Sequence, residues 1–96
     1  MQQFVILPKS DNEYLGEKSE VIKSLRYLNT APSSDATINV LWGPGIRIDL
    51  PNEQDPIPQM LVTFTEEEIA WNVLIKIAKE CNWMVQDTNS GRTLSF

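Results

Sequence analysis

The stretch from Phe64 to Cys81, FTEEEIAWNVLIKIAKEC, decides how the rest of this chain must be arranged. Thr65 and Glu68 have the spacing of a capping box, in which each side chain accepts a hydrogen bond from the other residue's backbone N–H. Phe64, before the cap, and Ile69, in the first turn, stand at the positions of a hydrophobic staple. The stretch is therefore predicted to be a helix.

The apolar residues of this helix cover more than half of its circumference at ~100° per residue. Such a helix is expected to pack between a sheet and a neighbouring helix, because a surface helix needs only a narrow apolar stripe. Trp71 and Ile75 stand at the margin of the stripe and offer an alternative, since tryptophan is common at binding hot spots. Trp71 is therefore kept as a candidate contact for a partner protein.

Length and composition indicate one globular domain spanning residues 1–96, with 42% hydrophobic and 22% charged residues. There is no apolar run of about 18 residues that would predict a membrane span, and no basic segment leading into an apolar signal region. The one cysteine, Cys81, cannot form an intrachain disulfide. A reducing compartment, the cytoplasm, is expected.

The chain contains no histidine. It therefore lacks the usual general base and the commonest metal ligand. This excludes Ser/His/Asp and Cys/His nucleophile systems within the chain, and zinc sites of the Cys/His type. We expect a protein that is not an enzyme and that carries no cofactor.

The net charge of −5 is concentrated in the second half of the chain. Between Asp49 and Glu68 there are six carboxylates and no Lys or Arg. A surface of this kind repels nucleic acid and anionic lipid, and it favours basic partners. The acidic residues therefore become candidates for partner binding: Asp49, Glu53, Asp55, Glu66 and Glu67.

The remaining elements follow from periodicity and turn residues. Phe4–Leu7 is predicted to be a strand buried on both faces, and Glu17 to Asn29 a surface helix with one narrow apolar stripe. Residues 37–50 form the best hairpin in the sequence, with Gly43-Pro44-Gly45 as a three-residue loop. Later strands are predicted at 59–64, 83–86 and 92–96, and the proline-rich segment 51–58 is a stiff acidic loop.

The element order is therefore β-α-β-β-β-α-β-β. It predicts an α+β fold, a two-layer sandwich with two helices on one face of an antiparallel or mixed sheet, related to the ferredoxin-like βαββαβ pattern. If the alternating apolar residues of the later strands face the helices, the opposite face carries Leu41, Leu61 and Met84, together with one alternating pair of the first strand. The helix-facing set is Ile38, Val40, Trp42, Met60, Val62, Phe64, Trp83 and Val85. Either the 51–58 loop or a partner chain, such as another copy, must then cover the opposite face.

Two groups of polar residues resemble ligand-binding sites. Asp49, Glu53 and Asp55 could hold a hard cation, but prolines interrupt them and the glycine of a tight ligand loop is missing, so no metal is expected. Residues 87–92, DTNSGR, resemble an anion nest, but Asn-Ser-Gly between two strands is first of all a turn.

Three functions remain in view. The first is a small acidic non-catalytic protein that binds a basic partner protein, in the manner of an inhibitor or immunity protein. The second is a self-assembling, dimeric structural or regulatory subunit that uses Leu41, Leu61 and Met84. The third is a small-molecule-binding domain with a pocket between helix and sheet, near Trp42 or Trp71.

Overall fold

The computed structural model describes residues 2–9, 12–32, 39–51 and 54–94. These residues form two helices, α1 (Lys18–Tyr27) and α2 (Glu67–Cys81). They also form seven strands, of which β2 and β7 have only two residues each. The strands are β1 (Gln3–Leu7), β2 (Ala31–Pro32), β3 (Val40–Gly43), β4 (Ile46–Asp49), β5 (Met60–Phe64), β6 (Met84–Asp87) and β7 (Thr93–Leu94).

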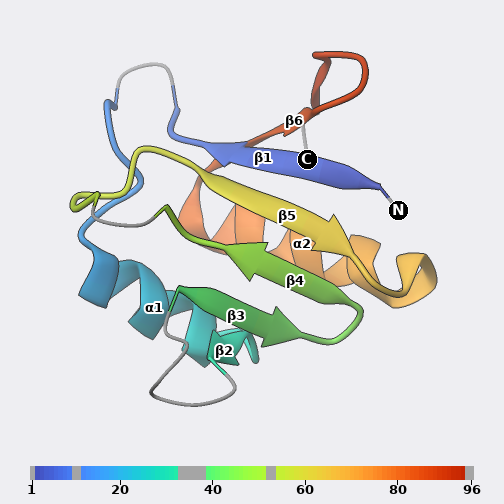
Figure 1. Cartoon of the computed structure of the whole chain (residues 1–96), viewed down its shortest axis with the longest axis horizontal. Coiled ribbons are helices and arrows are strands. Elements are labelled where there is room, and N and C mark those ends of the chain that lie inside the picture. Colours follow the sequence, from blue (N-terminus) through green and yellow to red (C-terminus); the bar gives the residue numbers. More distant parts are fainter. Residues whose placement is uncertain (1, 10–11, 33–38, 52–53, 95–96) are drawn as a thin grey trace.

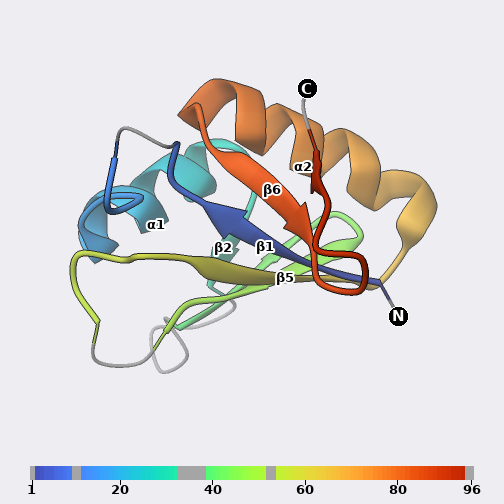
Figure 2. The same ribbon diagram turned by 90° about the horizontal axis from the view of Figure 1, so that it is seen from above.

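All seven strands of the described chain lie in one antiparallel sheet, in the order β2-β3-β4-β5-β1-β6-β7. Both helices cover the same face of this sheet (Figures 1 and 2). The fold is therefore an α+β two-layer arrangement, as predicted. The short strand β2, which pairs with the end of β3, was not predicted, because its residues Ala-Pro read as part of a connector.

The centre of the sheet has the ferredoxin-like connectivity. Strands β5 and β6 are both antiparallel to β1 and flank it, so α2 joins two parallel strands across an intervening one. In the same way β1 and β4 are parallel and flank β5. Strands β2 and β3 extend this central βαββαβ unit at one edge, and β7 extends it at the other.

The core lies between the sheet and the two helices. Strands β1, β4, β5 and β6 place alternate residues in it, and α1 and α2 each contribute one buried stripe. The apolar stripe predicted for α1 is confirmed, since Val21 and Leu25 are buried and Ile22 and Leu28 pack against the core. The buried stripe of α2 is narrower than predicted, and Ile69 is 43% exposed.

The hairpin between β3 and β4 has a different register from the predicted one. Gly43 is paired with Ile46, so the turn consists of Pro44 and Gly45 alone and is two residues long instead of three. A one-residue change of register moves every side chain of a strand to the opposite face. This change decides which residues of β3 face the helices.

Leu41, opposite Ile48, is fully buried on the helix side, whereas Trp42, opposite Arg47, is 44% exposed on the other side. The prediction that Val40 and Trp42 face the helices while Leu41 faces away is therefore wrong. Ile38, which was predicted to face the helices from the same strand, lies outside the described residues. The matching predictions for β5 and β6 are confirmed, since Met60, Val62, Phe64 and Val85 are buried.

The start of α2 is held by the hairpin rather than by a capping box. Its N-cap is Glu66, which makes no side-chain capping hydrogen bond, and Thr65 is exposed. The backbone N–H groups of Thr65 and Glu66 instead donate to the carbonyl oxygen of Gly45, at 2.8 and 3.1 Å. The predicted Thr65–Glu68 box is therefore not formed, because a carbonyl distant in sequence is the acceptor at this helix start.

Replacing Thr65 with alanine should change the free energy of unfolding by no more than about 0.5 kcal/mol, the usual limit for an exposed side chain with no special contact. A working capping box would instead make the same substitution cost about 0.5–2 kcal/mol. Urea titration of the two proteins separates these results, and a loss above 1 kcal/mol would contradict the observed helix start.

Candidate protein-binding face

The sheet has a second face that none of the described segments crosses (Figure 2). We call it the open face. The strand register brings alternate residues of five strands together on it. Its members are Gln3, Val5, Leu7, Val40, Trp42, Arg47, Asp49, Leu61, Thr63, Met84 and Gln86.

The middle of the open face is apolar. Val5 lies opposite Leu61 on one side, and Leu7 lies opposite Met84 on the other. These four side chains are half-buried, because neighbouring strands shield them only from the sides. Strand β1, which was predicted to be buried on both faces, is therefore fully buried only on the helix side, where Phe4 and Ile6 lie.

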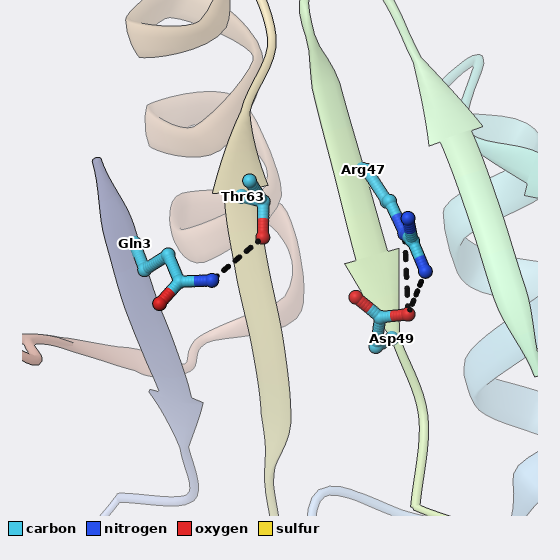
Figure 3. Close-up of polar contacts among 4 residues, drawn as sticks. All are labelled: Gln3, Arg47, Asp49 and Thr63. Atoms are coloured by element: carbon cyan, nitrogen blue, oxygen red, sulfur yellow. Dashed lines mark hydrogen bonds and ion pairs between the residues drawn. The ribbon is translucent and has the colours of Figure 1, made fainter. Parts of the chain in front are cut away.

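A polar row borders this apolar middle. Arg47 donates from Nη2 and Nε to Oδ1 of Asp49, at 2.9 and 3.2 Å, and its guanidinium carbon lies 5.4 Å from the centre of the Trp42 ring. Further along, Gln3 Nε2 donates to Thr63 Oγ1 at 3.4 Å (Figure 3). An ion pair this exposed contributes at most about 1 kcal/mol to stability.

The predicted self-association residues are split by the fold. Leu61 and Met84 lie on the open face as expected, but Leu41 lies in the core on the other side of the sheet.

Trp42 was predicted on the helix side, and Arg47 was not assigned to either face. One alternating pair of the first strand was expected on the open face, and the structure shows that the pair is Val5 and Leu7. The alternation of residues in β3 and β4 could have identified the face of Trp42 and Arg47. It does so only for a known turn length, because one residue more or less in the turn reverses the two faces of the strand.

The proline-rich segment does not lie over the open face in its described part, residues 54–58. Ile57 is fully buried and exchanges backbone hydrogen bonds with the strand-like segment before α1, from Ile57 N–H to the Gly16 carbonyl and from Leu15 N–H to the Ile57 carbonyl. The open face was predicted to be covered either by the 51–58 loop or by a partner chain. Residues 54–58 of that loop are therefore excluded as its cover.

The acidic residues predicted to bind a partner do not form one patch. Glu66 and Glu67 are exposed beside the hairpin turn, next to Gly45, whereas Asp49 is at the far end of β4. β5 has five residues, and its length of about 16 Å separates the two groups. Asp49 is already paired with Arg47, and Glu53 lies outside the described residues.

Asp55 has a structural role in addition to its charge. Its Oδ1 accepts a hydrogen bond from the backbone N–H of Lys18 at 2.9 Å, at the first residue of α1. The N-cap residue of that helix, Glu17, makes no side-chain capping bond of its own. A carboxylate from a distant loop therefore caps α1 and ties the 54–58 segment to it.

Replacing Asp55 with alanine should lower the free energy of unfolding by about 0.5–2 kcal/mol, since one N–H at the helix start loses its acceptor. Asp55→Asn retains an oxygen acceptor and is the matched control, with a smaller loss. The two variants can be compared by thermal or urea unfolding. Equal stability of Asp55→Ala and the original protein would show that this cap has no energetic role.

Trp71 is part of an aromatic cluster. Its ring meets Phe4 and Phe64 edge-on, at centroid distances of 5.2 and 5.0 Å, and those two rings are 4.9 Å apart. Such contacts add to the stability of a core. Trp71 is half-buried by them, so its described contacts are internal, and a role in partner binding stays a prediction.

A groove of about 560 Å³ runs between α1 and the end of α2. Tyr27, Leu28, Cys81 and Trp83 are among its lining residues, and Tyr27 is 89% exposed. It is distant from the places where a small-molecule pocket was predicted, since Trp42 is on the open face and Trp71 is in the aromatic cluster. Burial, with a smaller contribution from Glu80, raises the pKa of the Cys81 thiol, which makes it a poorer nucleophile at neutral pH.

Two further findings concern sites and membranes. Within residues 2–9, 12–32, 39–51 and 54–94, no group of three or more Cys, Asp or Glu side chains is placed to hold a metal ion. None of the helices found in those ranges is long and apolar enough to span a membrane.

Comparison of the chain with protein-family models, curated proteins and solved structures finds no match.

Proposed function

We propose that this chain is a small non-catalytic protein that acts by binding another protein, and that it does so through the open face. The observation that carries the proposal is the placement of both helices on one side of the sheet (Figure 2), which leaves Trp42 44% exposed on the same face as the apolar side chains of the middle strands. Apolar side chains gathered on one surface are typical of protein contacts. Tryptophan and arginine, here in a cation–π contact, are among the residue types most enriched at binding hot spots.

The chemistry of the chain supports a binding role over catalysis. It has no histidine, and burial raises the pKa of its one thiol. A single cysteine also fits the reducing conditions of the cytoplasm, which we propose as the location.

The test compares two variants, Trp42→Glu and Tyr27→Glu, in their ability to retain partner proteins. Trp42→Glu places a charge on the open face, and Tyr27→Glu places the same charge on the exposed helix side, where Tyr27 is 89% exposed. Each protein is immobilised and presented with an extract of its native cells. We expect the proteins retained by the original chain to be retained by Tyr27→Glu and lost by Trp42→Glu. Equal retention by both variants would overturn the proposal.

The basic partner predicted from the charge is a second candidate, supported by the exposed carboxylates Glu66, Glu67 and Glu68 at the start of α2. A partner docking there would associate faster at low salt, because exposed charges are screened as ionic strength rises. Reversing Glu66 and Glu67 together to lysine should lower the association rate and flatten its salt dependence. An unchanged rate and salt slope would remove this candidate.

A further inference from the structure

We infer that the protein bound at the open face is a second copy of this chain, docked sheet against sheet. The inference rests on the proposed function, which assigns protein binding to that face, and it names the partner. Three properties of the face support a second copy: its extent, the distribution of its apolar side chains, and its charge.

The extent of the open face is sufficient for a stable dimer. The molecule measures 32 × 31 × 22 Å, and the sheet extends across the two longer dimensions (Figure 1). A standard protein interface buries roughly 800 Å² on each partner. A face-to-face contact across this sheet can approach that area.

The apolar side chains are arranged as in the inner face of a two-sheet sandwich. Val5, Leu7, Leu61 and Met84 lie in the middle strands. Val40 and Trp42 form a second apolar group on β3, separated from the first by the Arg47–Asp49 pair of β4. Two sheets that pack face to face lie about 10 Å apart, with such side chains interleaved between them. A second copy supplies an identical apolar surface.

The charge of the open face favours a copy of this chain over a basic protein. The chain carries a net charge of −5, so two copies repel each other over most of their surfaces. On the open face the ionisable strand residues are Arg47 and Asp49, which pair with each other and leave the face neutral. A neutral face allows two acidic copies to meet, whereas it offers a basic partner no electrostatic gain.

A two-fold contact between identical faces also predicts how charge changes combine. In such an interface each substitution is present on both copies. If Arg47 and Asp49 exchange their charges, the exchanged pair on one copy therefore still meets opposite charges on the other. A contact between the open face and a different surface of the second copy would keep the charges of that surface and would oppose the exchange. This difference separates a two-fold contact between open faces from any other contact between two copies.

The mass in solution provides the test, measured by light scattering from tens of micromolar to one millimolar. We expect twice the 10.9 kDa of one chain for the original protein and for the control Tyr27→Glu. Leu61→Glu should give the mass of one chain. Asp49→Arg, which makes the face doubly positive, should raise the dimer dissociation constant at least tenfold, and the exchange Arg47→Asp with Asp49→Arg should restore it to within about threefold.

Circular dichroism and urea titration establish that each variant is folded before its mass is compared. An original protein that keeps the mass of one chain up to one millimolar would overturn the inference. The proposed function would survive that result if Trp42→Glu still lost a protein retained from extract. A dimer that persists in both Leu61→Glu and Asp49→Arg would overturn the inference as well, because it would form through another surface. A folded exchange variant that remains weakened would show that the open face does not meet its own equivalent on the second copy, and would overturn the sheet-against-sheet contact.

Discussion

Leu41→Ala should lower the free energy of unfolding by roughly 2–5 kcal/mol, the range for truncating a fully buried leucine. Leu41 is 0% exposed and lies opposite Ile48 on the helix side of the sheet. The neighbouring substitution Trp42→Thr, which replaces one residue type common in strands with another, should cost about 1 kcal/mol or less. The Trp42→Thr variant loses mainly the part of the indole ring that packs on the sheet and the cation–π contact with Arg47.

Urea titration of both variants gives the comparison, with the change in midpoint read at constant m-value. The pair tests the register of the β3–β4 hairpin, and the register decides which residues belong to the open face. A larger loss for Trp42→Thr than for Leu41→Ala would mean a three-residue turn. The open face would then carry Leu41 in place of Trp42.

Gly45→Ala should lower the free energy of unfolding by about 2–5 kcal/mol, from two separate causes. The backbone of Gly45 has a φ of +73°, a conformation that costs residues with a Cβ about 1–2 kcal/mol. A Cβ at this position would also lie 2.7 Å from the carbonyl oxygen of Glu66 and 3.1 Å from the backbone nitrogen of Ala70. The hairpin and the start of α2 would have to move apart.

Gly91→Ala is the matched control, because Gly91 has a similar φ of +71° and a Cβ there would meet no atom within 4 Å. Gly91→Ala should lower the free energy of unfolding only by the cost of placing a residue with a Cβ at positive φ, about 1–2 kcal/mol. The excess loss of Gly45→Ala in the same urea titration measures the close approach between hairpin and helix. Equal losses for the two glycines would contradict that contact.

Most of the fold could be predicted because local patterns and tertiary packing agree. The stripe of Val21 and Leu25 on α1, and the alternation of Met60, Val62 and Phe64 on β5, each indicated the face that is buried. The turn after β6 also followed from its residues, since Asn89 N–H donates to the Asp87 side chain and Gly91 adopts a positive φ. In these elements the residues that determine the structure are close in sequence.

The failures occur where the deciding partner is distant in sequence. Thr65 and Glu68 have the spacing of a capping box, but the N–H groups of Thr65 and Glu66 donate to the carbonyl of Gly45, which the β4–β5 pairing brings beside the helix start. The carboxylate of Asp55 appeared free for a partner and instead caps α1. Neither contact can be read from local spacing.

The candidate site was predicted only in part for the same kind of reason. Leu61 and Met84 were placed correctly, because the alternation of their strands has one reading. Leu41 was misplaced because Gly43-Pro44-Gly45 allows a turn of two or three residues, and one residue reverses the strand. The acidic residues clustered in sequence were separated in space because β5 lies between them.

The quenching of Trp42 fluorescence by acrylamide tests most directly whether the open face is both exposed and used for binding. A variant with Trp71→Phe and Trp83→Phe keeps aromatic rings at those positions and leaves Trp42 as the only indole. At nanomolar concentration its emission should be quenched readily, and quenching should fall as protein concentration rises and copies cover the face. An indole shielded even at nanomolar concentration would contradict the exposed face. Quenching that stays high up to one millimolar would contradict its use by a second copy.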